Sequence, residues 1–199
     1  MKKLGTLLGL VLLVVSPAKA ATSIPALKKT IEDPATGLNL QPGFAAELIY
    51  QVDKNKYGSW ISMAFDKQGR LLVSDQHNNG LFRLTLPGIG EKFSEKNITK
   101  LNLKGGVQGL LFAFDHLYMV RYGSLSRAKV LANGGFGPEE VISDLKGAGE
   151  HGPHSMLITE DGKGIYVIAG NMTKIPKHQK SRIQENMKDD NLLNNYAFG

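Results

Sequence analysis

Short apolar runs with a period of two dominate the chain from Phe44 onward, and turn residues separate them. Such alternation over about four to eight residues is typical of β-strands. One unit occurs three times: an apolar strand, a turn that contains an aspartate, and a second apolar strand. Its copies are SWISMAFDKQGRLLVSDQHNNGLFRLTL, VQGLLFAFDHLYMVRYGSLSRAKVLA and PHSMLITEDGKGIYVIAGN. The pattern predicts an all-β chain of consecutive strands.

The spacing of the repeated turn narrows the architecture. Asp66, Asp115 and Asp161 lie 49 and 46 residues apart. Repeats of about 40 to 50 residues are typical of the four-stranded blades of a β-propeller. A β-sandwich, whose strands are also short and regularly spaced, is the alternative. The recurrent turn favours a partial β-propeller of about three four-stranded blades, over residues 42–176.

The expected strands follow from the apolar runs. In the first blade they cover 60–65, 70–75, 81–86 and 98–103, and Asn79-Gly80 forms a tight hairpin turn between the second and third. In the second blade they cover 109–114, 117–122, 125–131 and 139–145. Residues 21–41 are expected to form an N-terminal arm, which contains a short helical candidate, ALKKTIED.

The first twenty residues are expected to be a secretory signal peptide. MKK precedes an apolar run from Leu4 to Val15, and SPAKA follows, with Ala18 and Ala20 as the small residues before a cleavage site. The run is too short to span a bilayer comfortably. We therefore expect a periplasmic or secreted protein with no membrane span after cleavage.

Charge and cysteine content exclude several classes. The formal net charge of the 199 residues is +6, and removal of the leader with its three lysines leaves +3. No basic stripe interleaved with aromatic residues remains, so a nucleic-acid partner is not expected. The chain has no cysteine, which excludes disulfides and covalent haem attachment within it.

The segment EHGPHS, residues 150–155, carries the candidate chemistry. His151 and His154 are three positions apart, with Pro153 stiffening the loop and Glu150 able to hydrogen-bond a ring nitrogen. A histidine side chain titrates near neutrality and can act as a general base. Two histidines give only two metal ligands, and no further ligand cluster stands nearby in sequence, so we expect no metal here. A purely structural pair stays open.

The stretches LQPGFAAELIYQV, GSWISMAFDKQGRLLVSDQ, VQGLLFAFDHLYMV and EHGPHSMLITEDGKGIYVIAGNMTKIP resemble the N-terminal part of the glucose/sorbosone dehydrogenase-like β-propellers. Exported forms of that family often carry a haem domain. The similarity spans about residues 38–176, and EHGPH through AGN is its most specific element. It implies a six-bladed ring that binds a sugar or related alcohol at the mouth of its central channel, together with pyrroloquinoline quinone and calcium.

The resemblance also implies a role for His151. It matches the family histidine that takes the proton of a substrate hydroxyl while hydride passes to the quinone. The implied function is that of an exported sugar or aldose dehydrogenase of the sorbosone type, with a haem domain or cytochrome as a partner in the intact family. The alternative is a non-catalytic propeller that binds a carbohydrate or a protein through the same channel mouth.

Further polar and aromatic side chains lie at expected strand ends. Candidates for substrate binding, besides His154, are Trp60, Gln108 and Asp75. Trp60 could stack on a ligand or pack in the core, and Gln108 and Asp75 could line the channel or pair with backbone. Arg121 could contact an acidic ligand, but we expect it to be a solvated arginine at a strand edge.

The chain becomes polar and irregular over 177–199. At about 45 residues per blade, the 179 residues after the leader allow three to four blades. The quinone-binding groups implied by the resemblance come largely from later blades and cannot be assigned here. We therefore expect an incomplete propeller, a fragment that is not itself a competent dehydrogenase.

Overall fold

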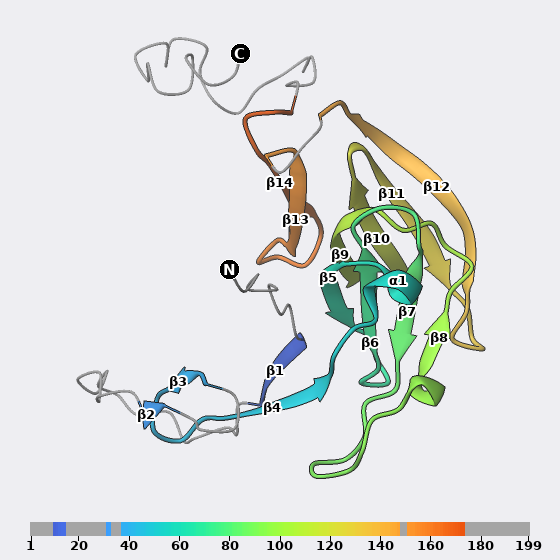
Figure 1. The fold of residues 1–199 in the computed structure, drawn as a ribbon. Helices are drawn as coiled ribbons and strands as arrows, with labels where there is room; N and C mark the ends of the chain where they lie inside the picture. The colour runs from blue at the N-terminus through green and yellow to red at the C-terminus, as the bar shows by residue number, and fades with distance from the viewer. Residues whose placement is uncertain (1–9, 15–30, 33–36, 148–150, 174–199) are drawn as a thin grey trace, which may run out of the picture. The chain divides into compact units, whose positions relative to one another are not determined.

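The computed structural model describes residues 10–14, 31–32, 37–147 and 151–173 (Figure 1). The chain divides into two compact units, one of residues 1–53 with 87–95 and one of residues 54–86 with 96–199. Except for Leu10–Val14, the expected leader lies outside the described residues, as does the polar tail. No helix in the described ranges is long and apolar enough to cross a membrane.

The first unit holds two small antiparallel strand pairs. Strand β1 (Leu10–Val14) pairs with β4 (Ala45–Tyr50), and β2 (Ile31–Glu32) pairs with β3 (Asn39–Leu40). The ring of Tyr50 contacts Phe93 at a centroid distance of 5.1 Å. This contact joins β4 to the 87–95 loop of the same unit.

The second unit begins with a single helical turn, α1 (Lys54–Tyr57), followed by a four-stranded antiparallel sheet. Its strands lie in chain order: β5 (Trp60–Phe65), β6 (Leu71–Asp75), β7 (Leu81–Leu84) and β8 (Ile98–Lys100). A short 3₁₀ turn, η1 (Glu95–Asn97), precedes β8. All of β6 is buried, as its unbroken apolar run LLV indicates.

A second four-stranded antiparallel sheet repeats the same order. It contains β9 (Val107–Ala113), β10 (His116–Arg121), β11 (Gly123–Val130) and β12 (Phe136–Leu145). A third repeat contributes the hairpin β13 (Pro153–Ile158) and β14 (Ile165–Ala169). The prediction of an all-β chain built from four-stranded antiparallel sheets is confirmed, with strand ends displaced by up to three residues.

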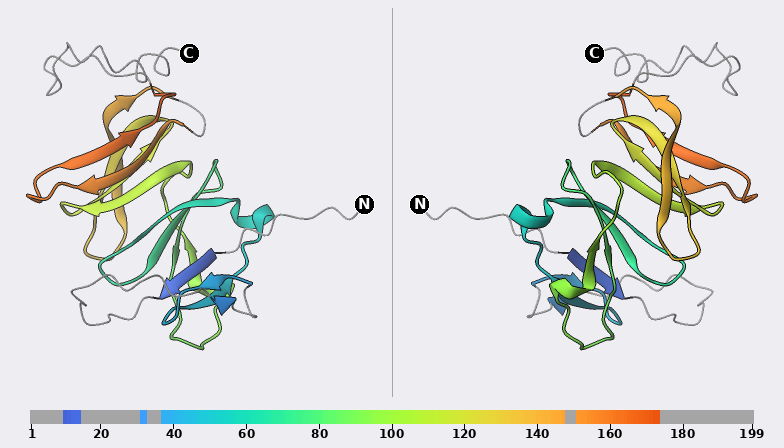
Figure 2. Two further views of the ribbon diagram at one scale, coloured as in Figure 1. Left: turned by 90° about the vertical axis from the view of Figure 1, so that its left-hand side faces the viewer. Right: turned by 90° about the vertical axis from the view of Figure 1, so that its right-hand side faces the viewer.

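Figure 2 shows the two four-stranded sheets in two further views. The hydrophobic core lies between these sheets. Leu72 and Leu81 of the first sheet pack with Leu117, Met119 and Ala128 of the second, all essentially inaccessible to solvent. The first strands of the three repeats are neighbours, with β5 beside β9 and β9 beside β13. This is the arrangement expected for the inner strands of adjacent propeller blades.

Two turns differ from the sequence prediction. The prediction of a tight turn at Asn79-Gly80 is wrong, because a five-residue loop, 76–80, joins β6 to β7. Within this loop only Gly80 has a positive φ, of 132°. A type I′ turn instead joins β9 to β10, where Phe114 and Asp115 have φ angles of 48° and 56°. Asx-type hydrogen bonding explains the first case, because Asp75 organises the longer loop through its side chain.

Candidate functional site at the bulged strand starts

Each of the strands β5, β9 and β13 carries a β-bulge near its first residue. The partner strand has one residue fewer opposite each of three short segments: Trp60 to Ser62 in β5, Val107 to Gly109 in β9, and Pro153 to Met156 in β13. Bulges are common beside active sites, where they re-aim a side chain. Three of the predicted site residues, Trp60, Gln108 and His154, lie in or at the edge of these bulges. We call this end of the second unit the bulged end.

The backbones at the bulged end approach one another closely. The hydroxyl of Ser62 donates to the carbonyl of Val107 at 2.5 Å. A Cβ atom on Gly109 would overlap the carbonyl oxygen of His154. Only glycine fits at this point, and its lack of a side chain allows the bulge of β13 to pack against the bulge of β9. The structure thereby brings Gln108 and His154 into one neighbourhood, and their role at a channel mouth stays a prediction.

Gln108 has an unusual side-chain environment. Its Nε2 atom is buried and has no hydrogen-bond partner among the described residues. A buried amide donor without an acceptor costs free energy, so such groups in native proteins call for an explanation. A ligand with oxygen acceptors, such as a hydroxyl group, would satisfy it.

His151 lies in the loop that leads into β13, and its side chain is exposed. Its carbonyl accepts a hydrogen bond from the backbone amide of Met172 at 3.1 Å, and the Gly170 amide donates to the Gly152 carbonyl at 3.0 Å. A Cβ atom on Gly170 would overlap the His151 carbonyl oxygen. The backbone of His151 is therefore held by the loop after β14. Glu150 lies outside the described residues.

Trp60 belongs to an aromatic cluster. Its ring centroid lies 6.1 Å from that of Tyr57 and 6.1 Å from that of Phe82, and Tyr57 meets Phe82 edge-on at 5.4 Å. These distances are in the range of favourable aromatic pairs. The cluster packs one face of the first sheet, which corresponds to the core-packing alternative for this residue. The contacts of Trp60 with Tyr57 and Phe82 are those of core packing. Stacking of Trp60 on a ligand stays a prediction.

Asp75 is 1% exposed and accepts three backbone hydrogen bonds. Its Oδ1 atom accepts from the amide of Ser59 at 2.8 Å, and its Oδ2 atom accepts from the amides of His77 and Asn79 at 2.8 and 2.9 Å. The geometry is that of the backbone-pairing alternative. The Asp75 carboxylate thereby connects the loop before β5 to the loop after β6 at the bulged end.

Arg121 was expected to be solvated, and this expectation is wrong. The guanidinium forms an ion pair with Glu139 and donates to the carbonyls of Lys104 and Gly105 at 2.8 and 3.0 Å. Burial lowers the pKa of Arg121, and the carboxylate of Glu139 opposes this effect. Arg121 therefore holds the loop before β9 against the second sheet. The spacing of charged residues along the chain did not predict these contacts.

The described residues of the bulged end do not by themselves form a site for a quinone and calcium. Pyrroloquinoline quinone carries carboxylate groups, which call for cationic partners, but Arg121 is engaged by Glu139 and two carbonyls. Within the described ranges, no group of three or more His, Asp or Glu side chains could hold a metal ion. What the bulged end does offer is hydrogen-bonding and imidazole groups, which suit a polyhydroxylated ligand.

Comparisons with known proteins give only distant similarities. No protein-family model and no curated protein sequence matches the chain. Two solved structures are similar at 18% identity: the iodide structure and the calcium structure of Trichoderma reesei Carbohydrate-Active Enzymes Family AA12. Their TM-scores are 0.46 and 0.44, and the matches cover 58% and 53% of this chain. They cover 31% and 27% of those structures, so the chain spans less than a third of their length.

Proposed function

We propose that the bulged end binds a sugar or a related polyhydroxylated alcohol and that the protein belongs to the glucose/sorbosone dehydrogenase-like propellers. The buried, unpartnered Nε2 atom of Gln108 carries the proposal, because a hydroxyl oxygen is the acceptor that it lacks. The bulges of β5, β9 and β13 support it, since all three occur at the same end of adjacent inner strands.

His151 is the proposed general base. When it acts, the O–H bond of a bound hydroxyl group breaks and an N–H bond forms on the imidazole. The backbone contacts to Gly170 and Met172 hold the loop that presents this side chain. The resemblance in sequence implies a quinone as the hydride acceptor, but the described residues do not form a site for one, so no step through it is assigned.

Sugar binding can be tested with the single tryptophan of the chain. Trp60 lies at the β5 bulge, so its fluorescence reports on this end alone. Titration of the 199-residue chain with D-glucose or L-sorbosone is expected to change the emission, and Gln108→Leu is expected to weaken the response several-fold. Lys163→Gln, at an exposed turn, is the control and should leave it unchanged. No response up to roughly molar sugar would contradict the proposal, since protein–carbohydrate contacts weaker than that carry negligible free energy.

The base is tested by turnover in an intact homologous six-bladed propeller, with the substitutions made at the positions that match His151 and His154, and measured as dye reduction with added pyrroloquinoline quinone and calcium. His151→Gln should lower kcat by roughly 100-fold or more while the sugar still binds, because general-base assistance acts in the transition state. His154→Gln should have a much smaller effect. Equal, modest losses in both variants would indicate a structural pair instead.

A second candidate function is a non-catalytic propeller that binds carbohydrate. The poor fit of the described residues to a quinone favours it. Sugar binding without dye reduction by an intact homologous propeller would support this candidate and separate it from the dehydrogenase.

A further inference from the structure

Gln108 is the extra residue of the β9 bulge. In the ladder between β9 and β10, Val107 pairs with Arg121 and Gly109 pairs with Val120, so no residue of β10 stands opposite Gln108. A bulge leaves its extra residue outside the ladder and re-aims its side chain. The contacts that hold Val107 and Gly109 therefore decide where the side chain of Gln108 points.

Two serine hydroxyl groups of the first sheet hold both backbone groups of Val107. The hydroxyl of Ser62 donates to the Val107 carbonyl at 2.5 Å, and the Val107 amide donates to the hydroxyl of Ser74 at 3.0 Å. Ser62 in β5 and Ser74 in β6 are directly paired across the two strands. Both hydroxyls therefore come from one face of the first sheet. We call Ser62 and Ser74 the serine pair.

The serine pair lies in an otherwise apolar interface. Ser74 is fully buried, and its cross-strand partner Leu81 belongs to the hydrophobic core. A buried hydroxyl costs free energy unless it is hydrogen-bonded. Ser74 accepts a hydrogen bond from Val107 and donates one to the carbonyl of Asp75 at 3.0 Å. An apolar side chain could pack at this position without a partner, so what the hydroxyl adds is its hold on Val107.

Gly109 fixes the other side of the bulge. Any Cβ atom there would overlap the carbonyl oxygen of His154, so the backbone of β13 lies directly against it. Gln108 is thus flanked by one residue held from the first sheet and one held by β13. Its buried Nε2 atom is directed before a ligand arrives, which reduces the entropy cost of binding.

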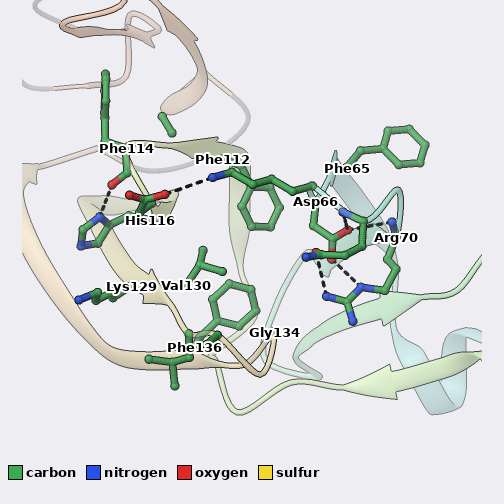
Figure 3. A pocket seen from close by; sticks show the side chains of 16 residues that line it. Phe65, Asp66, Arg70, Phe112, Phe114, His116, Lys129, Val130, Gly134 and Phe136 are labelled. Carbon is green, nitrogen blue, oxygen red and sulfur yellow. Dashed lines mark hydrogen bonds and ion pairs between the residues drawn. The ribbon is translucent and has the colours of Figure 1, made fainter.

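The same two sheets stand apart at the other end of β9. A pocket of about 540 Å³ separates them there, and Phe112 and Phe136 line it (Figure 3). The ion pair between Lys67 and Asp115 spans this end at 3.1 Å, and both side chains are more than three-quarters exposed. Exposed ion pairs contribute little to stability. The serine pair, by contrast, holds β9 against the first sheet with hydrogen bonds that are partly or fully buried.

We propose that Ser62 and Ser74 are positioning residues of the bulged end, which fix the β9 bulge through Val107 and direct the Nε2 atom of Gln108 to a hydroxyl oxygen of the ligand. The inference rests on the proposed sugar site, because Gln108 is the group that touches the ligand there. A serine pair that only joined the two sheets would contribute to stability and leave the direction of Gln108 unchanged.

The direction of Gln108 is measured first, by nuclear magnetic resonance of its side-chain amide in the 199-residue chain without a ligand. Ser62→Ala removes the hydrogen bond to the Val107 carbonyl and is expected to speed the exchange of the Gln108 amide protons with solvent. Ser62→Thr keeps the hydroxyl and suits a strand, so it should retain the native exchange rate. Lys67→Gln, which breaks a contact between the same sheets at the pocket end, is the control and should have no effect.

Ser74→Ala is the second variant, since it removes the acceptor of the Val107 amide instead. It should speed the same exchange as Ser62→Ala does. Native exchange of the Gln108 amide protons in both alanine variants would overturn the proposal. This measurement needs no sugar, so it decides the role of the serine pair even if the native chain binds none and the proposed function fails.

A double-mutant cycle on sugar affinity separates positioning from a general loss of structure. D-glucose is titrated and followed by Trp60 fluorescence, and Ser62→Ala should weaken binding by about threefold or more, within the range of one hydrogen bond. In the Gln108→Leu background the same change should cause no further loss, because the group that the serine positions is gone. An equal loss in both backgrounds would overturn the proposal, because Ser62 would then act independently of Gln108.

Discussion

Gly109 determines how closely β9 and β13 approach. Its φ is not in the left-handed region, so conformational freedom is not the reason for a glycine there. The reason is space, because any Cβ would overlap the backbone carbonyl of His154. Backbone cannot move aside as the end of a flexible side chain can. Any larger residue must therefore push the two strands apart.

Gly109→Ala is expected to destabilise the second unit by about 2 kcal/mol, the usual range for overpacking a tight contact. Gly137→Ala is the matched control. Gly137 is also a strand glycine, but its Cβ would lie 3.7 Å from the nearest atoms of Lys129, an ordinary contact. Urea unfolding monitored by Trp60 fluorescence measures both. Equal stability of the two variants would show that β13 shifts freely and does not depend on Gly109.

Polar residues at strand ends were identifiable from the sequence, but their partners were not. Asp75 was expected either to line a channel or to pair with backbone, and it accepts hydrogen bonds from Ser59, His77 and Asn79. Arg121 was expected to be solvated, and it contacts Glu139, 18 residues later in the chain. Such partners lie on other loops and strands. Local patterns carry no information about them until the sheets are assembled.

Strand positions followed closely from the alternation of apolar residues. The inner strand of the first repeat, Trp60–Phe65, has the predicted bounds. The bulges at the strand starts were not predictable, because so few residues lie beyond each extra residue that the shift it causes in the alternation is not visible in the sequence. The residue pair Phe114-Asp115 carries no recognised signal for a type I′ turn, whereas Asn79-Gly80 does and forms none.

The three aspartate turns look alike in sequence and differ in structure. Asp66 accepts hydrogen bonds from Gln68 and Arg70 within its turn, whereas Asp115 points to Lys67 of another turn. Asp161 accepts from the hydroxyl of Thr159 at 2.6 Å and from the amide of Lys163 at 3.1 Å. The hydrogen bond from Thr159 is the larger cause that lowers the pKa of Asp161, and the Lys163 amide adds to it.

Thr159→Val is expected to raise the pKa of Asp161 towards that of an ordinary aspartate, because the hydrogen bond to the charged form is lost. A lowered pKa means that the carboxylate stabilises the hairpin above the unfolded pKa, and that this contribution disappears as the pH falls through the folded value. The variant should show less of this acid-dependent loss. Nuclear magnetic resonance titration of the Asp161 carboxyl carbon measures the pKa, with Thr99→Val as the control. An unchanged midpoint in Thr159→Val would contradict the assignment.

The hairpin β13–β14 is apolar on both faces. Met156 and Val167 are half-buried on one face, and β13 neighbours β9 and β10 of the second sheet. On the other face, Leu157 is 67% exposed, Tyr166 59% and Ile168 63%. Strands buried on both faces have continuous apolar runs, and PHSMLI and IYVIA come close to that pattern. Such sequences favour a second layer that covers the exposed apolar face of the hairpin, as a neighbouring blade does in a propeller.

The chain is therefore expected to associate with itself at raised concentration through the face of Leu157, Tyr166 and Ile168. Contiguous apolar patches on a sheet promote association, whereas a single exposed apolar side chain does not. Tyr166→Lys combined with Ile168→Lys should lower the average mass measured by sedimentation velocity, while leaving the circular dichroism spectrum unchanged. Ile89→Lys is the control, since Ile89 is 90% exposed in a loop of the other unit. If the double variant associates as strongly as the native chain, this face is not the contact and association uses another surface, such as the exposed side chains of β5.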